Sequence, residues 1–169
     1  MKLVNDVLEL SRIESGNMSF HCEDCSAHHF AETVYQTHQV IILPPVEFIK
    51  EFPDEDVTIH IDRMRLTQVI TNFLGNAKKF TSQGHIKLGY FCDKEKKEIH
   101  IFVEDTGAGI PKEELQMIFE RFYKRNEFVQ GVGLGLAISK VIVEKMNGHI
   151  DVQSEVNKGS RFTAVLPYL

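Results

Sequence analysis

Cysteine, net positive charge and long apolar runs are scarce or absent in this sequence of 169 residues. Three cysteines are too few for a disulfide framework, and their odd number is typical of a reducing compartment. No apolar run approaches the roughly 20 residues of a membrane-spanning helix. The N-terminal residues predict an amphipathic helix rather than a signal peptide. We therefore expect a cytoplasmic chain with no membrane segment, which leaves room for a parent protein anchored through other regions.

The charge balance excludes a broad electrostatic surface for nucleic acid. The formal net charge is −5, so we expect no nucleic-acid partner. Apolar residues make up 43% of the chain and charged residues 25%, as in ordinary soluble domains. The length indicates one domain with a sizeable core.

One short segment combines two cysteines with two histidines: Cys22, Cys25, His28 and His29. These residue types can hold zinc, but the ligand pairs of zinc sites are usually much farther apart in sequence. We favour an ordinary loop here and keep zinc as the alternative.

Hydrophobic periodicity predicts an α+β fold. Asp62 is a suitable N-cap for the longest helix. We expect helices over residues 3–14, 26–40, 62–80, 112–121 and 134–146, and strands over 47–52, 57–61, 85–92, 99–104, 149–154 and 161–167. This order predicts a two-layer α/β sandwich, in which helices cover one face of a mixed, mostly antiparallel sheet.

Three polar residues share one face of the helix predicted over 62–80. Asn72, Asn76 and Lys79 stand at i, i+4 and i+7. Amides are costly to bury without partners, and two amide oxygens beside an ammonium suit a hydrated Mg²⁺ that carries phosphates. The alternative is a polar stripe that faces solvent.

A carboxylate and two glycines follow the strand predicted over 99–104. Asp105 could accept a hydrogen bond from the amino group of adenine, whereas guanine has a carbonyl there, so the site would favour ATP over GTP. Gly107 and Gly109 would let the backbone approach the base. The alternative is an ordinary turn that Asp105 caps.

The glycine-rich stretch GVGLGL (residues 131–136) opens the helix predicted over 134–146. Backbone N–H groups at a helix N-terminus, together with the helix dipole, suit a polyphosphate. The stretch lacks the Lys-Ser/Thr of a P-loop and the preceding strand of a dinucleotide fold. A plain tight turn is the alternative.

An aromatic and basic segment, IFERFYKR (residues 118–125), precedes a stretch with no clear periodicity. Phe119 and Phe122 could anchor one end of a mobile segment, and Lys124 and Arg125 could reach phosphates when it closes. The alternative is a core aromatic pair next to surface charge.

In this order, the four motifs resemble those of sensor histidine kinases. NFLGNAKKFT (72–81) is similar to their N box, DTGAGI (105–110) to the G1 box, IFERFYK (118–124) to the F box and GVGLGLAISK (131–140) to the G2 box. NKGSRFTAVLP (157–167) resembles the closing strand, and LVNDVLELSRIESG (3–16) resembles the end of the second helix of the dimerisation and phosphoacceptor domain.

The resemblance implies the Bergerat ATP-binding fold, which gyrase-type topoisomerases, mismatch-repair ATPases and ninety-kilodalton heat-shock chaperones share. It implies catalytic roles for Asn72, Asn76 and Lys79: Asn76 as the Mg²⁺ ligand, Asn72 assisting it, and Lys79 on phosphate. Asp105 would bind adenine, and residues 123–131 would form the ATP lid. The other implied nucleotide contacts are Gly107, Gly109, Ile110, Phe119, Phe122, Tyr123, Lys124, Gly131, Val132, Gly133, Leu134, Gly135 and Leu136. Val132 stands where the family often has Ser or Thr.

By the same resemblance, residues 1–16 are the end of the dimerisation helix and residues 17–169 are the catalytic domain. None of the eight histidines has the sequence context of the family's phosphoacceptor. The implied partners are therefore the phosphoacceptor domain of the parent chain and the receiver domain of a response regulator. We expect a monomer or weak dimer, because one helix per chain cannot build a four-helix bundle.

Three other functions remain open. A topoisomerase- or chaperone-type ATPase needs a carboxylate near position 72, and Asn72 is a poor general base. A degenerate scaffold is disfavoured because all four motifs are intact. A serine kinase of the mitochondrial dehydrogenase-kinase type shares the fold, but RIESG (12–16) favours a bacterial sensor kinase.

Overall fold

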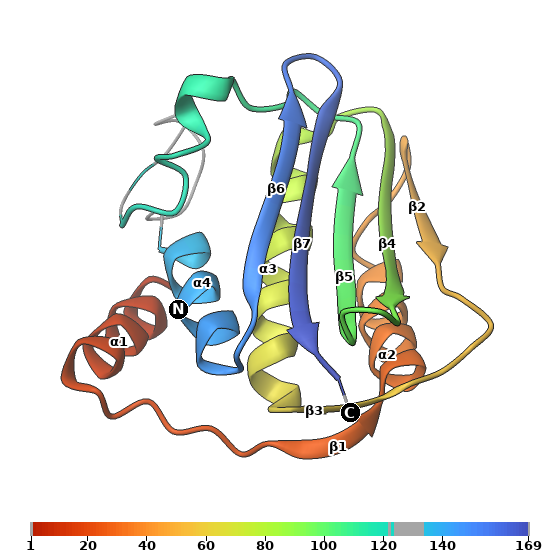
Figure 1. Cartoon of the computed structure of the whole chain (residues 1–169). Coiled ribbons are helices and arrows are strands. Elements are labelled where there is room, and N and C mark those ends of the chain that lie inside the picture. Colours follow the sequence, from red (N-terminus) through yellow and green to blue (C-terminus); the bar gives the residue numbers. More distant parts are fainter. Residues whose placement is uncertain (1, 122, 124–133, 169) are drawn as a thin grey trace.

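A computed structural model of the chain describes residues 2–121, 123 and 134–168 (Figure 1). The helices are α1 (Lys2–Ser15), α2 (Ala27–Gln39), α3 (Arg63–Phe80) and α4 (Gly135–Lys145), and η1 (Lys112–Glu114) is a single 3₁₀ turn. The strands are β1 (Glu23–Ser26), β2 (Val46–Glu51), β3 (Thr58–Ile61), β4 (Gly84–Asp93), β5 (Glu98–Asp105), β6 (His149–Glu155) and β7 (Gly159–Pro167).

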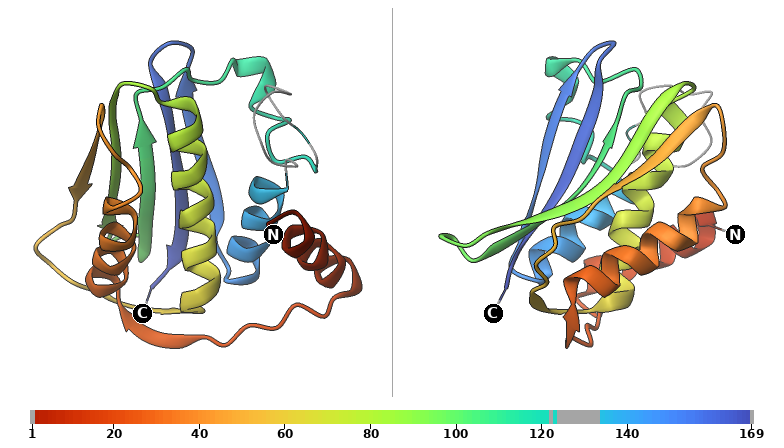
Figure 2. Two further views of the ribbon diagram at one scale, coloured as in Figure 1. Left: turned by 180° about the vertical axis from the view of Figure 1, so that it is seen from behind. Right: turned by 90° about the vertical axis from the view of Figure 1, so that its right-hand side faces the viewer.

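The main sheet has five strands in the order β2-β4-β5-β7-β6. β2 and β4 pair in parallel, and the other neighbours pair antiparallel. Helices α2, α3 and α4 all lie on one face of this sheet, as the two further views show (Figure 2). The arrangement confirms the predicted two-layer sandwich with its mixed, mostly antiparallel sheet.

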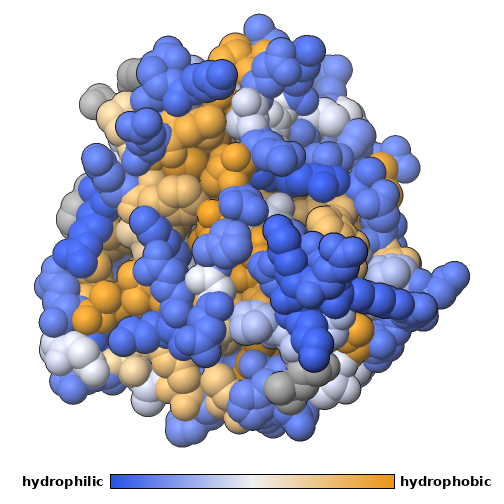
Figure 3. Space-filling view, viewed as in Figure 1, coloured by the Kyte–Doolittle hydropathy of each residue, from blue (hydrophilic) through white to orange (hydrophobic). Residues whose placement is uncertain are grey.

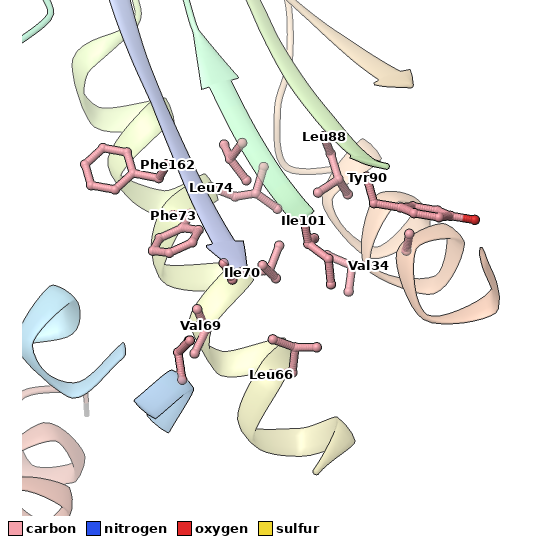
Figure 4. Close-up of a cluster of buried hydrophobic side chains, with 14 of the residues drawn as sticks. Val34, Leu66, Val69, Ile70, Phe73, Leu74, Leu88, Tyr90, Ile101 and Phe162 are labelled. Atoms are coloured by element: carbon pink, nitrogen blue, oxygen red, sulfur yellow. The ribbon is translucent and has the colours of Figure 1, made fainter. Parts of the chain in front are cut away.

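The core fills the space between the helices and this face of the sheet (Figure 4). α3 turns an apolar stripe toward the strands, which Ile70 and Phe73 represent at 0% and 1% exposure. The strands contribute alternate residues, such as Ile101 and Phe162. Burying each of these side chains stabilises the fold by about 1.5–3 kcal/mol. Because this apolar face of α3 is buried against the sheet, only the remaining faces of the helix can contact other groups.

Asp62 starts α3 as the sequence predicts. Its side chain accepts a hydrogen bond from the backbone N–H of Arg65 at 3.1 Å, which satisfies a donor in the first helical turn. The other carboxylate oxygen accepts from the N–H of His21 at 2.9 Å. One buried carboxylate thus joins the segment after α1 to the start of α3.

The prediction of a loop over the cysteine-containing segment is wrong except at Cys22, because Cys25 lies in β1 and His28 and His29 lie in α2. β1 pairs antiparallel with β3 in a separate two-stranded sheet, and the buried Cys25 lies opposite Ile59. The four residues EDCS carry little strand preference of their own, and pairing with β3 decides their conformation. The described part of the chain holds no cluster of three or more His, Cys, Asp or Glu that could bind a metal ion.

The prediction of a helix over residues 112–121 is also wrong. Only η1 forms, and a series of turns follows it, with i to i+3 bonds such as Met117 N–H to Glu114 O at 2.9 Å and Glu120 N–H to Met117 O at 3.0 Å. Ile118 and the half-buried Leu115 pack onto the core at a spacing of three, which suits i+3 turns. Apolar spacing alone did not separate such turns from an α-helix.

α1 packs against the helical layer rather than standing away from it, and its neighbour is α4 (Figure 1). Leu10 and Ile13 lie against the core. Glu9 pairs with Arg65 of α3 at 2.6 Å, and these side chains are only 13% and 18% exposed. No described helix combines the length and apolar composition of a membrane span.

The other face of the sheet has no described helix over it, and hydrophilic residues dominate it in space-filling view (Figure 3). Phe102 lies on this face and is nevertheless only 1% exposed. The guanidinium of Arg161 covers its ring at 4.0 Å and donates to Glu104 at 3.1 Å. Charged residues therefore shield the apolar surface on the side without helices.

Candidate functional site

Residues of the predicted motifs lie along α3, whose C-terminal end is beside the end of β5 and whose middle is beside the start of α4 (Figure 1). The backbone N–H of Ala108, in the turn after β5, donates to Phe80 O at the end of α3 at 3.2 Å. Asn72 of α3 donates to Gly135 O, at the start of α4, at 3.2 Å. These contacts bring the Asn72–Lys79 face, the Asp105 turn and the start of α4 into one region.

Asn72 joins the two helices. Its amide nitrogen donates to Gly135 O and to the Ser139 hydroxyl at 3.0 Å, and that hydroxyl donates to Gly135 O at 2.8 Å. Ser139 is completely buried. The amide nitrogen of Asn72 is therefore committed to α4, and only its carbonyl oxygen is left to assist a metal ion.

Replacing Ser139 with alanine is expected to lower the free energy of unfolding by about 1 kcal/mol, because Asn72 loses one partner and Gly135 loses another. Asn72→Ala should cost about 1–2 kcal/mol, and the double variant should cost less than the sum because the two side chains share one network. Urea denaturation measures all three values. Thr71→Ala, an exposed substitution on the same helix, is the control and should change little. Strict additivity would contradict the network.

Asn76 and Lys79 lie one and two turns after Asn72 on α3. Asn76 is half-buried, and its amide makes no hydrogen bond to another described residue, while Lys79 is exposed. An amide oxygen is a suitable ligand for a hard cation that keeps most of its coordination for water and phosphate. Because the described residues include no carboxylate cluster, we expect a cation here to depend on the oxygens of its own ligand.

Asp105 is a buried carboxylate, 7% exposed, at the end of β5. Burial raises the pKa of its carboxyl, while the backbone N–H groups of Gly107 and Ser160 and the nearby Thr81 hydroxyl oppose that shift. One oxygen accepts from Gly107 N–H at 2.9 Å. The group retains acceptor capacity in an apolar setting, so a ligand that brings an N–H donor would be favoured.

The two glycines of the turn are required by protein contacts. A β-carbon on Gly107 would lie 2.3 Å from Phe80 O, and one on Gly109 would lie 2.0 Å from Glu155 O. Gly109 also has φ +73°, in the left-handed region that favours glycine. The turn can therefore pack against α3 and β6 only with glycine at both positions.

Three hydroxyl groups around Asp105 were not anticipated from the sequence. Ser160 lies opposite Asp105 in the β5–β7 register, and its hydroxyl lies 2.7 Å from that of Ser154. Ser154 also accepts from Ile110 N–H at 2.7 Å. Thr81, at the end of α3, is 5% exposed. The pairing of β5 with β7 and the packing of the end of α3 bring these hydroxyls together, and no local sequence pattern predicts that arrangement.

α4 begins without a side-chain cap. Leu134 occupies the N-cap position, and the first intrahelical bond runs from Ile138 N–H to Leu134 O at 2.9 Å. The N–H groups of Gly135 and Leu136 therefore have no partner within the helix. Such a helix end is suited to an anion.

The structure describes only some of the remaining predicted nucleotide contacts. Ile110 is buried, and Phe119 and Tyr123 pack half-buried against the core. Six predicted contacts lie outside the described residues: Phe122, Lys124, Arg125, Gly131, Val132 and Gly133. Most of the predicted lid, residues 123–131, lies outside them as well.

A family model described as "Histidine kinase-, DNA gyrase B-, and HSP90-like ATPase" matches residues 61–169. The chain is 35% identical to the sensor histidine kinase WalK of Bacillus subtilis, over 99% of this chain and 28% of that protein. It is 44% identical to the sensor protein SrrB of Staphylococcus aureus, over 63% of this chain and 19% of that protein. The chain thus spans less than a third of the length of these relatives.

Solved structures give the same result. Full-length ShkA in complex with AMPPNP superposes with a TM-score of 0.90 at 28% identity, covering 99% of this chain and 35% of that one. The catalytic domain of the histidine kinase ThkA superposes with a TM-score of 0.77 at 28% identity, covering 88% of this chain and 97% of that one. These matches confirm the resemblance to sensor histidine kinases.

Proposed function

The chain belongs to the family of histidine kinase-, DNA gyrase B- and HSP90-like ATPases, and on this premise we propose that it is the catalytic domain of a protein-histidine kinase. It would bind Mg·ATP and transfer the γ-phosphoryl group to a histidine of a phosphoacceptor domain. The observation that carries the proposal is the arrangement along α3, which carries Asn76 between the Asp105 turn at its C-terminal end and the uncapped start of α4 beside Asn72.

Each part of this region matches a different part of Mg·ATP. Asp105 accepts from the amino group of adenine, and the N–H groups at the start of α4 bind phosphate. Asn76 offers its amide oxygen as a Mg²⁺ ligand, with the carbonyl oxygen of Asn72 assisting and Lys79 on phosphate. Bound Mg²⁺ would supply neutralisation of the charge on the transferred phosphoryl group. The chain's own contribution is to position the nucleotide.

Transfer to an external acceptor is favoured over hydrolysis. A hydrolase needs a base to activate water, and the amide of Asn72 is not basic. Its nitrogen is also held by Gly135 and Ser139. Phosphoryl transfer depends mainly on positioning and charge neutralisation, which this region provides without a base of its own. The nucleophile would come from the acceptor histidine.

The N-terminal helix fits the same proposal. Residues 1–16 would be the end of the helix that leads from the phosphoacceptor domain, and residues 17–169 the catalytic domain. The acceptor domain of the parent chain is then the immediate partner, and the receiver domain of a response regulator is the next. The site of action would be the cytoplasm, where ATP is available.

Mg·ATP is expected to raise the melting temperature of the chain. A ligand at one hundred times its Kd stabilises the folded state by about 2.7 kcal/mol, which corresponds to several degrees for a domain of this size. Differential scanning fluorimetry with Mg·ATP and Mg·GTP measures this, and GTP should give a smaller shift. Equal melting curves with and without ATP would refute nucleotide binding.

Kinase activity is tested by supplying a phosphoacceptor domain in trans with γ-labelled ATP. We expect acid-labile label on the added domain only, because none of the chain's histidines has an acceptor context. Nucleotide binding without label on any acceptor domain, together with steady phosphate release, would favour the ATPase alternative.

A further inference from the structure

Thr81 carries a buried hydroxyl that has no hydrogen-bond partner among the described residues. It stands at the C-cap of α3 and is 5% exposed. Buried hydroxyl groups in folded proteins nearly always have a partner, because an unsatisfied one costs its full desolvation penalty. An exception beside a proposed ligand site points to a partner that the ligand supplies.

The surroundings of Thr81 place it beside the proposed adenine contact. A β-carbon on Gly107 would lie 2.8 Å from the Thr81 hydroxyl oxygen, so the hydroxyl lies directly over the Asp105–Gly107 turn. It is close enough to lower the pKa of the Asp105 carboxyl, although it does not reach hydrogen-bonding geometry. The end of α3 and this turn are held together by the bond from Ala108 N–H to Phe80 O. A buried acceptor and a buried hydroxyl therefore stand side by side.

The base edge of adenine presents a matching pair. Its 6-amino group is a donor and the adjacent ring nitrogen N1 is an acceptor, whereas guanine has an acceptor and a donor at the same two positions. Ionised Asp105 can only accept, while a threonine hydroxyl can donate. The two side chains together match the adenine edge, and guanine would face Asp105 with its carbonyl.

We propose that Thr81 is a second base-recognition residue, whose hydroxyl donates to N1 of adenine, directly or through one bound water, while Asp105 accepts from the 6-amino group. This inference rests on the proposed nucleotide binding. The bound adenine nucleotide would then supply the hydrogen-bond partner that the Thr81 hydroxyl lacks. The C-terminal end of α3 would contribute to the preference of the site for adenine over guanine.

The test compares Thr81→Val with the unchanged chain, using ATP and 1-deaza-ATP, in which a C–H group replaces N1. Isothermal titration calorimetry with Mg²⁺ measures the affinities. The unchanged chain should bind 1-deaza-ATP about 5- to 10-fold more weakly than ATP, as expected for one neutral hydrogen bond. Thr81→Val should bind ATP weaker by the same factor and should not distinguish the two nucleotides. Thr81→Ser keeps the hydroxyl and should behave like the unchanged chain.

Two controls keep the result interpretable. 7-Deaza-ATP changes a different ring position and should affect the unchanged chain and Thr81→Val equally. The melting temperature of nucleotide-free Thr81→Val should equal or exceed that of the unchanged chain, because valine keeps the shape and removes an unsatisfied group. A clear loss of stability would show that the hydroxyl already has a partner and would overturn the inference.

The remaining outcomes are also decisive. An equal penalty for 1-deaza-ATP in both proteins, or unchanged ATP affinity in Thr81→Val, would remove Thr81 from base recognition while leaving nucleotide binding intact. If the unchanged chain does not bind ATP at all, the proposed function fails and this inference fails with it.

Discussion

Replacing Asp105 with asparagine is expected to weaken ATP binding by about a hundredfold and, at the same time, to raise the melting temperature of the nucleotide-free chain at neutral pH. The first effect follows because an amide is a weaker acceptor than a carboxylate, and hydrogen bonds to charged groups are the stronger ones. The second follows because asparagine removes a buried negative charge: Asp105 is only 7% exposed, and burial raises the pKa of its carboxyl. Calorimetry and thermal unfolding measure the two effects separately.

The pH dependence of that stability difference has a definite sign. The folded chain holds a proton on Asp105 more tightly than the unfolded chain, because the pKa of its carboxyl is raised on folding. The cost of the buried charge is therefore fully present above the folded pKa and disappears as the pH falls through it. The advantage of Asp105→Asn should be largest near neutral pH and shrink in acid. Asp54→Asn, at an exposed position, is the control and should give no such trend.

Replacing Asn76 with alanine is expected to reduce phosphoryl transfer to an added phosphoacceptor domain by about 10²–10³-fold, the effect of losing a group that acts on developing charge. The fold should survive, because Asn76 is half-buried on α3 and alanine favours helices. Initial rates over a range of Mg²⁺ concentrations measure the effect, and the variant should need more Mg²⁺.

Lys78→Ala is the matched control for Asn76→Ala. Lys78 is exposed, and it lies on the same helix two residues away, where its side chain points in a different direction. Transfer by this variant should stay within a few-fold of the original rate. An unchanged Mg²⁺ requirement in Asn76→Ala would rule out this residue as a metal ligand.

Features set by local chemistry could be predicted from the sequence. Asp62 caps α3 because its side chain meets an N–H three residues later, and that relation is visible in one dimension. The long strands β4, β5 and β7 and the helices α3 and α4 follow from periodicity in the same way. The site residues on α3 share a face because their spacing is helical.

Features set by partners distant in sequence could not be predicted. β1 exists because β3 pairs with it, and the turns around Met117 exist because i+3 bonds suit the packing there better than a helix. The bond from Asn72 to Ser139 crosses between two helices, 67 residues apart in sequence. The isolation of the Thr81 hydroxyl is a property of three-dimensional surroundings, and a sequence does not state which hydroxyl will lack a partner.

The packing of α1 also determines how this helix can move. Glu9 pairs with Arg65, Glu14 is hydrogen-bonded to Arg121 in the segment after η1, and Leu10 lies against the core. Successive residues of a helix are turned by about 100°, so the two ion pairs leave α1 on different sides. The half-exposed pair of Glu14 with Arg121 contributes little, so the largely buried pair of Glu9 with Arg65 and the packing of Leu10 are the main contacts that oppose rotation of α1 about its axis. A rotation of α1 would therefore have to break its contacts with Arg65 and the core.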